Sequence, residues 1–395
     1  MPYKGLQKDM VRKALKLFLL PIERILFERA KNLKIGSLQK TVHIVRGDTI
    51  GDFVLFSAVL PYFKKIYPGY KIVLIGDAVW KELALWLKEN KILGGGRSFD
   101  ELIAVDGKKY NRNPFYYYKI LKKIRLGAPE IVVQTTFSRT EKSDRWVLVS
   151  KESLKIGYEG DLSNIKAWPK AKNDTEYNRL IKNPESGLET KRNKHFLNEL
   201  AGCEILKSGL PEWRVGEGLK MEGRSFLKSI GVDASKPIVI VCPNGSERKR
   251  SWTRENFVSL TLKLHKYDDS FQFVLTGGQR DQADCLKIQE TLKSKGLRAH
   301  NICAKTSLPE LAEILSVSNV YIGAETGSMH MASAIGIPIV VLRWEGHYER
   351  FFPYPAWKPG SQNIVVLQKR DESDGAIKIK EAFNRIMVIL KNEQK

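Results

Sequence analysis

The stretch NVYIGAETGSMHMASAIGIPIVVLRW, residues 319–344, decides the fold of this chain. Its two ends, NVYIGA and IPIVVLRW, are short apolar runs of the kind found in buried strands. The SMHMASAIG segment between them predicts a helix whose small residues let it lie close to a sheet. A strand, a helix and a strand in immediate succession predict a βαβ unit, and fully apolar strands are typical of parallel sheets buried on both faces.

The same alternation continues on both sides of this unit. In the second half, strands are predicted at 237–243, 271–278 and 363–368, and helices at 253–267, 281–295, 308–318 and 374–391. In the first half, strands are predicted at 41–45, 71–76, 101–105 and 130–135, and helices at 53–66 and 78–89. Residues 150–220 are polar and predict an insertion, a helix near 193–201 and a linker near 207–220. Two parallel sheets predict a two-lobed α/β protein with a cleft between the lobes.

The composition points to anionic partners. The chain of 395 residues holds 66 Lys and Arg against 44 Asp and Glu, a net charge of +22, which favours phosphates, nucleic acid or an anionic membrane face. No apolar run approaches the ~18–20 residues of a membrane span. Four cysteines without a CxxC pair argue against a zinc ribbon or a disulfide scaffold and favour a reducing compartment. No HExxH or HxxxH spacing indicates a metal site.

The N-terminal extension, residues 1–40, is basic and has apolar residues at mostly helical spacing. One interpretation is a helix that packs on the body of the protein with a solvated basic face. The other is a helix on a membrane surface, with its cations against anionic lipid. Pro21 predicts a break into two short helices.

The loop RGDTIGD, residues 46–52, follows the first strand and opens a helix, a place where backbone N–H groups can meet an anion. It is neither a dinucleotide-binding nor a Walker motif. Asp52 stands where the helix starts, at the carboxyl edge of the sheet. The two interpretations of Asp52 are a helix N-cap and a general base that faces the cleft. Asp48 is the weaker candidate for the same catalytic role.

Three loops follow strands of the second half. In PNGSERKRSW, residues 243–252, a Gly–Ser turn and three cations predict a pyrophosphate clamp, or else an exposed basic loop. In TGGQRDQ, residues 276–282, Gly277 and Gly278 allow close approach of a nucleotide and Asp281 can accept from ribose hydroxyls. Loops at the carboxyl ends of neighbouring parallel strands form a crevice that binds nucleotides. No DxD motif supplies ligands for a metal-bridged diphosphate, so cationic side chains and helix ends must stabilise the leaving group.

The third loop lies in GAETGSMHMASAIG, residues 323–336. Thr326, Gly327 and Ser328 can aim N–H and hydroxyl donors at phosphate oxygens. His330, one turn further, is either part of this site or a core histidine. Glu325 would repel a phosphate, so we expect it to accept from hydroxyls or to orient the loop.

The sequences of these loops, and their order along the chain, resemble those of glycosyltransferase family 9, the ADP-heptose:lipopolysaccharide heptosyltransferases. The matching segments are 50–68, 243–257, 276–282 and 306–342. The resemblance implies a GT-B fold of two Rossmann-like lobes, acceptor in the first and nucleotide sugar in the second, and an inverting, metal-independent reaction without a cofactor. It implies an N-terminal domain over 41–215, a C-terminal domain over 216–375 and, over 376–395, a C-terminal helix that packs back toward the N-terminal lobe.

Carried over by position, Asp52 corresponds to the family's catalytic base and Arg250 to a lysine that contacts the diphosphate. The family usually has Asp where this chain has Glu325. The remaining assignments are Lys249, Thr326, Gly327, Ser328 and His330 for the diphosphate, Gly277, Gly278 and Asp281 for the nucleoside, and Arg46, Gly51 and Arg139 for the acceptor side.

The sequence therefore predicts a glycosyltransferase that moves a sugar, in first place heptose from ADP-heptose, to the lipopolysaccharide core or a similar anionic glycan. We expect it in the cytoplasm, with peripheral contact to the inner membrane and no specific nucleic-acid partner. The alternatives are a GT-B enzyme that uses another nucleotide sugar, an epimerase of similar architecture, or a basic nucleic-acid-binding protein. The last is suggested by the net charge and by the basic, aromatic stretch 108–125.

Overall fold

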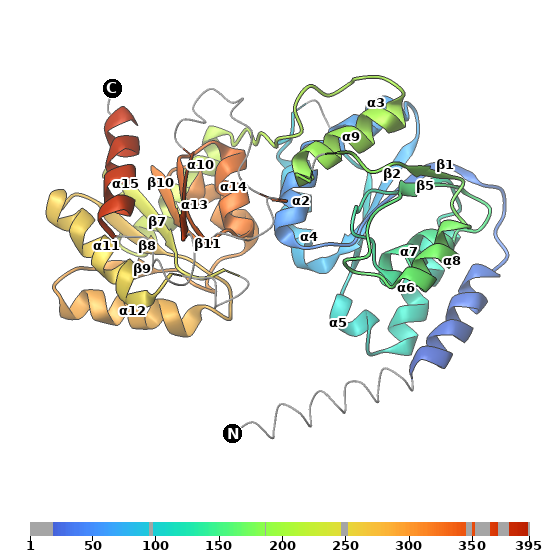
Figure 1. Cartoon of the computed structure of the whole chain (residues 1–395), viewed down its shortest axis with the longest axis horizontal. Coiled ribbons are helices and arrows are strands. Elements are labelled where there is room, and N and C mark those ends of the chain that lie inside the picture. The colour runs from blue at the N-terminus through green and yellow to red at the C-terminus, as the bar shows by residue number, and fades with distance from the viewer. Residues whose placement is uncertain are drawn as a thin grey trace.

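The computed structural model describes residues 19–94, 98–185, 187–245, 252–344, 350–351, 364–369 and 379–393. These residues form two lobes, each built on a six-stranded parallel sheet with helices packed on it (Figure 1). The two parallel sheets confirm the α/β prediction from the strand–helix alternation. Among the described residues, no helix has the length and hydrophobicity needed to span a bilayer.

The sheet of the first lobe has the strand order β3-β2-β1-β4-β5-β6. Its strands are β1 (Gln39–Arg46), β2 (Lys71–Asp77), β3 (Glu101–Val105), β4 (Pro129–Gln134), β5 (Leu154–Tyr158) and β6 (Arg179–Ile181). Its helices are α2 (Ile50–Phe56), α3 (Phe63–Ile66), α4 (Lys81–Glu89), α5 (Gly107–Tyr110), α6 (Pro114–Leu126), α7 (Glu141–Leu148), α8 (Ala167–Asp174) and α9 (Glu189–Ala201). The strand order reverses direction at β1 and β4, where crevices for ligands form in such sheets.

Two predictions for the first lobe were wrong. The single helix over 53–66 is split into α2, a 3-10 turn at Leu60–Tyr62 and α3, since Pro61 at the start of that turn has no N–H to continue an α-helix. Residues 150–220 are no insertion, because β5 and β6 complete the sheet and α9 covers it. Polar residues conceal β5 in the sequence: Lys155 is buried there with its ammonium donating to the carbonyls of Lys151 (3.0 Å) and Ser153 (2.9 Å).

The sheet of the second lobe has the order β12-β11-β10-β7-β8-β9. Its strands are β7 (Ile238–Cys242), β8 (Gln272–Leu275), β9 (Ala299–Asn301), β10 (Val320–Gly323), β11 (Ile339–Trp344) and β12 (Ile364–Lys369), and its helices are α10 (Glu217–Ser229), α11 (Arg254–Tyr267), α12 (Gln282–Ser294), α13 (Leu308–Leu315), α14 (Gly327–Ile335) and α15 (Ile379–Glu393). The βαβ unit of residues 319–344 is present as β10, α14 and β11.

The C-terminal helix corrects another prediction. Instead of returning to the first lobe, α15 packs on α11 and β11 of its own lobe (Figure 1). The rings of Tyr267 and Phe383 lie 5.9 Å apart there, and Ile386 and Leu390 enter the same apolar cluster as Val340 of β11. The helix therefore buries its apolar face against the core of its own lobe.

The N-terminal helix packs on the body of the first lobe. Glu23 pairs with Arg145 at 2.7 Å, Lys31 pairs with Glu176 at 2.6 Å, and the Arg29 guanidinium lies over the ring of Tyr118. Residues 19–31 are helical without interruption. The described helix begins only two residues before Pro21, and a break caused by its missing N–H would fall before residue 19, outside the described residues.

The lobes are in direct contact through α2 and α14, and one cluster of buried apolar side chains extends through both. The indole N–H of Trp86 donates to Glu313 between the lobes at 2.9 Å. Trp213, in the segment before α10, donates its indole N–H to Ser57 at 3.0 Å and its backbone N–H to the carbonyl of Ala334 in α14 at 2.8 Å. The contact brings the first turns of α2 and α14 together: a Cβ on Gly327 would lie 2.9 Å from Ile50, and a Cβ on Gly51 would lie 3.0 Å from His330. These two helix starts carry the candidate residues from the sequence.

Candidate active site

The turn between β1 and α2 places Asp52 at the start of a helix. Thr49 is the N-cap, and Asp52 completes a capping box with it: the Oδ2 atom of Asp52 accepts from the Thr49 hydroxyl at 2.6 Å and from the Thr49 N–H at 3.3 Å. The simple N-cap interpretation of Asp52 was therefore wrong by position, because the cap is Thr49. One carboxylate oxygen of Asp52 is held by the helix start, and the group is only partly exposed.

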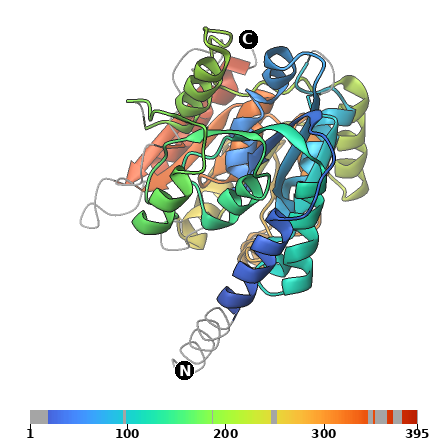
Figure 2. The same cartoon turned by 90° about the vertical axis from the view of Figure 1, so that its right-hand side faces the viewer.

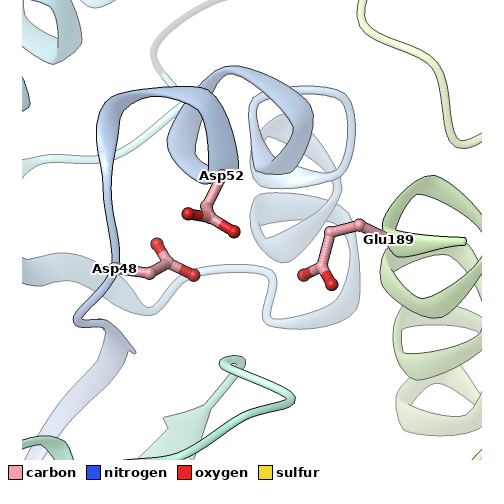
Figure 3. A group of neighbouring side chains, drawn as sticks. All are labelled: Asp48, Asp52 and Glu189. Atoms are coloured by element: carbon pink, nitrogen blue, oxygen red, sulfur yellow. The ribbon is translucent and has the colours of Figure 1, made fainter. Parts of the chain in front are cut away.

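Asp52 is one of three neighbouring carboxylates (Figure 3). Asp48 lies in the same turn, and Glu189 opens α9, which is more than a hundred residues further along the chain. One oxygen from each of the three lies within 4.8 Å of the others. The sequence analysis missed Glu189, since nothing in the local pattern distinguishes it from the surface glutamates of other helices.

Arginines compensate this negative charge. Arg46, at the end of β1, is completely buried, and its guanidinium lies 2.7 Å from Asp48 and 2.9 Å from Glu189. It also donates to the carbonyl of Thr135 and to the side chain of Asn193, each at 3.1 Å. The predicted acceptor-side residue Arg46 is thus part of the site as the internal counter-ion of its carboxylates.

A second arginine reaches the same group from the other lobe. Arg350 follows β11, and its Nε and Nη2 atoms each lie 3.1 Å from Glu189. Its Nη1 atom donates to the hydroxyl of Ser138 at 2.7 Å. Both oxygens of Glu189 are therefore occupied by arginines.

The three carboxyl groups differ in acidity. Burial raises the pKa of Asp52 above its ordinary value, and the charge of Glu189 raises it further, against the opposing effect of Arg46. Burial also raises the pKa of Asp48, to about 8. Burial opposes ionisation of Glu189 too, but the charges of Arg46 and Arg350 outweigh it and lower the pKa of Glu189. Burial thus favours the protonated forms of Asp48 and Asp52, whereas the arginines favour the ionised form of Glu189.

The start of α14 presents hydroxyl groups near this cluster. The hydroxyls of Thr326 and Ser328 lie 2.8 Å apart, and both lie within 3.1 Å of the phenolic oxygen of the buried Tyr321. Gly327 lies against Ile50 of α2. The small residues at this turn therefore let the helix start of the second lobe approach the one that carries Asp52.

His330 is buried at the contact between the lobes, beside Gly51. Burial lowers the pKa of His330 to about 3, so its imidazole is neutral. It can offer an N–H to a ligand but no positive charge. Its assignment to the diphosphate stays a prediction, as does the role of Glu325 in the same loop.

The predicted nucleoside loop is held by its own carboxylate. The Oδ2 atom of Asp281 accepts from the N–H of Gly278 at 2.8 Å, and a Cβ on Gly277 would lie 2.8 Å from that of Asp281. Asn244, which follows β7, donates to Asp284 in the first turn of α12 at 3.0 Å. The ends of β7 and β8 are thereby joined at the edge of the sheet where the nucleotide was predicted.

Among the described residues, one predicted acceptor-side residue, Arg139, is not brought to the cluster. Lys249 and Arg250 of the clamp lie outside the described residues. Arg139 is in the first lobe but fully buried; it is hydrogen-bonded to Asp174 and lies 3.6 Å from Asp144. Its expected place on the acceptor side was wrong, because these two carboxylates hold the guanidinium inside the lobe.

Asp48, Asp52 and Glu189 also form the group of carboxylates that could surround a cation in the described part of the chain. Arg46 and Arg350 already compensate its charge, and a cation would have to displace their ion pairs. The donor set therefore gives no reason to add a metal. Metal independence stays a prediction.

The chain is similar in sequence to known heptosyltransferases. The family model described as glycosyltransferase family 9 (heptosyltransferase) matches residues 146–374. The chain is 21% identical over 330 residues to lipopolysaccharide heptosyltransferase 3 of Escherichia coli, which covers 81% of this chain and 86% of the relative. It is 23% identical over 319 residues to the lipopolysaccharide core heptosyltransferase OpsX of Haemophilus influenzae, covering 80% and 82% of the two chains.

The fold has a close counterpart among solved structures. The structure of the ADP-heptose lipopolysaccharide heptosyltransferase II of E. coli superposes with a TM-score of 0.67 at 17% identity, covering 90% of this chain and all of that one. The two parallel sheets and this likeness confirm the GT-B fold.

Proposed function

The chain belongs to glycosyltransferase family 9, the heptosyltransferase family, and is therefore a glycosyltransferase; we propose that it moves a heptose from ADP-heptose to the lipopolysaccharide core with inversion at the anomeric carbon. The observation that carries the proposal is the meeting of two helix starts from different lobes. One carries the carboxylate of Asp52, and the other carries the hydroxyl and N–H donors of Thr326, Gly327 and Ser328.

In the proposed reaction, Asp52 removes the proton from an acceptor hydroxyl. The freed electron pair of that oxygen attacks the anomeric carbon from the face opposite the diphosphate. The bond from this carbon to the diphosphate oxygen breaks, and ADP leaves with the bonding electrons. A base must lie on the acceptor side of the sugar for this inversion, and Asp52 belongs to the acceptor lobe.

Negative charge develops on the departing diphosphate, and positively polarised or cationic groups at fixed positions can stabilise it. The first N–H groups of α14 lie at its start, at Gly327 and Ser328, and the helix dipole favours an anion there. The sequence adds Lys249 and Arg250 as cations of the same lobe. Because the start of α14 is placed before the substrate arrives, its N–H groups can stabilise the leaving group without a metal ion.

A basic surface at the acceptor lobe fits an anionic, membrane-tethered acceptor. The α5–α6 segment follows β3 at the same sheet edge as the Asp52 turn, and its Phe115 side chain is 88% exposed. Helix 19–31 lies beside α6 (Figure 2) and exposes Ile25. Exposed cations on these segments are Arg24, Arg29, Lys108, Lys109, Arg112, Lys119, Lys122 and Lys123. An exposed aromatic among cations is suited to the headgroup region of an anionic membrane.

Sedimentation with vesicles tests this membrane contact. The full chain is expected to pellet with vesicles that contain phosphatidylglycerol and less with neutral ones, and Phe115→Glu should weaken the binding. Trp168→Glu is the matched control, because Trp168 is also an aromatic side chain that is mostly exposed (75%), and it lies on α8, outside these two segments. Equal pelleting of all proteins, or equal binding to neutral vesicles, would remove the membrane contact from the proposal.

The role of Asp52 is tested by Asp52→Asn. Loss of a positioned base costs about 10²–10⁴ in rate, so ADP release should nearly cease while the dissociation constant for ADP-heptose changes little. Asp77→Asn is the control, because Asp77 ends the neighbouring strand β2 and caps its own turn. Near-normal turnover of Asp52→Asn would refute the assignment.

The donor is tested independently by thermal shift. ADP and ADP-heptose are expected to raise the melting temperature of the chain by mass action, more than UDP or GDP at the same concentration. A preference for UDP or GDP would replace ADP-heptose by another nucleotide sugar and leave the family assignment unchanged.

A further inference from the structure

Arg350 connects the two lobes at the carboxylate cluster. It lies in the connection between β11 and β12 of the second lobe, yet its side chain binds Glu189 and Ser138 of the first lobe. Its backbone carbonyl also accepts from the N–H of Glu189 at 2.6 Å. Arg350 thus holds both the side chain of Glu189 and the first N–H of α9, which has no side-chain cap of its own.

Glu189 in turn influences Asp52. The side chain of Glu189 is 1% exposed, so its charge is poorly screened by water. One of its oxygens lies within 4.8 Å of an oxygen of Asp52. Two anions at this separation oppose each other's ionisation, and a cation bound to one of them relieves the other.

We infer that Arg350 is a positioning residue for the transfer reaction: by holding and neutralising Glu189, it keeps the neighbouring Asp52 carboxylate ionised and able to accept a proton. The inference rests on the proposed role of Asp52 as the base. It assigns to the second lobe a part in acid–base chemistry, in addition to binding the nucleotide.

The groups that face Asp52 explain why Arg350 has this role. Arg46 and Asp48 come from the same turn and strand as Asp52, and Glu189 comes from α9 of the same lobe. Arg192, one turn further along α9, also lies 3.8 Å from Glu189, on the side of the first lobe. From the second lobe, α14 contributes the imidazole of His330, which is neutral. Among the described residues, Arg350 is therefore the charged group that the second lobe brings to this cluster.

The experiment measures the ionisation of Asp52 without requiring turnover. The full chain labelled with ¹³C at the aspartate carboxyl is titrated by NMR, and Asp52→Asn identifies the resonance. Arg350→Gln is expected to shift the Asp52 titration to higher pH, and Arg350→Lys to restore it in large part. The double variant Glu189→Gln, Arg350→Gln should titrate at or below the wild-type pH, because the opposing anion is gone.

The same variants are compared in kcat/KM for heptose transfer across pH. Arg350→Gln is expected to lose roughly tenfold on the acidic limb, which corresponds to one pKa unit, and much less on the alkaline plateau. Arg224→Gln, which removes an exposed ion pair with Glu217 in α10, is the control and should follow the wild type.

An unchanged Asp52 titration in Arg350→Gln would overturn the inference, as would a shift that persists in the double variant. A merely structural arginine would lower activity equally at every pH. If the wild type transfers no heptose while the NMR titrations behave as expected, the proposed function fails and the electrostatic link between Arg350 and Asp52 stands.

Discussion

Arg46 and Glu189 form a completely buried ion pair beside Asp52, with Nη2 and Oε1 2.9 Å apart, although 143 residues separate them in the chain. The pair joins the end of β1 to the start of α9. It thereby fixes the turn that carries the proposed base against the helix that completes the lobe. The guanidinium also lies over the ring of Phe56, which restricts its orientation further.

Breaking this pair should destabilise the protein strongly. Arg46→Met leaves Oε1 of Glu189 and the carboxyl of Asp48 without their buried partner, although Arg350 still holds Oε2 of Glu189. Removing one member of a buried pair costs about 3–5 kcal/mol. The double variant Arg46→Met, Glu189→Leu should recover part of this loss, because no buried charge is left behind at position 189. Urea unfolding of the single and double variants measures both effects. Equal stability of Arg46→Met and the wild type would contradict the role of the pair.

The pH profile of the reaction should carry the signature of a buried base. Asp52 acts only when ionised, so kcat/KM falls as the pH drops through its pKa. Burial and Glu189 raise that pKa above the ordinary value of 3.8. The acidic limb of the wild type should therefore lie above 3.8, and Glu189→Gln should move it down. If kcat/KM of the wild type falls only near pH 3.8, and Glu189→Gln does not change that pH, this electrostatic account is contradicted.

Asp48 should make stability depend on pH. Its pKa is about 8 in the folded chain against 3.8 ordinarily, so the folded state binds the proton more tightly. The free energy of unfolding is then highest below pH 3.8, as far as this group is concerned, and declines as the pH rises toward 8. Asp48→Asn should flatten the decline by up to about 1.4 kcal/mol per pH unit. Urea titrations at several pH values between 5 and 8 measure the slope, and identical slopes would rule out a raised pKa.

Gly327 should be required for the approach of the two lobes. The Cβ of Gly327→Ala would lie 2.9 Å from Ile50, closer than side chains tolerate. We expect about a tenfold loss of kcat/KM, since small displacements of reacting groups are costly.

The double variant Ile50→Ala, Gly327→Ala restores the space and should regain most of the activity. Gly36→Ala is the control, because nothing lies within 4 Å of the added carbon. A loss that Ile50→Ala does not relieve would indicate that Gly327 matters for the donor and not for lobe contact.

The second lobe was the more predictable part of the fold. Its strands, such as β7 and β11, are uninterrupted apolar runs, and Thr253 and Ser307 cap the helices expected of them. The resemblance to the heptosyltransferase family, carried by loops of both lobes, is confirmed by the family match. Between residues 150 and 220 the helix predicted near 193–201 is present as α9, but both strands were missed. Strands that bury Lys155 or span as few residues as β6 have no clear apolar signature.

The sequence by itself determined where strands and helices alternate and that Asp52 stands at a strand–helix junction, because apolar periodicity and caps depend on neighbours in the chain. Only the tertiary structure decided that Glu189 and Arg350 meet beside Asp52, and that Arg139 is enclosed by Asp144 and Asp174. Ion pairs between distant segments leave no local pattern. Their energies depend on burial and separation, which exist only once the sheets have formed and the lobes have come together.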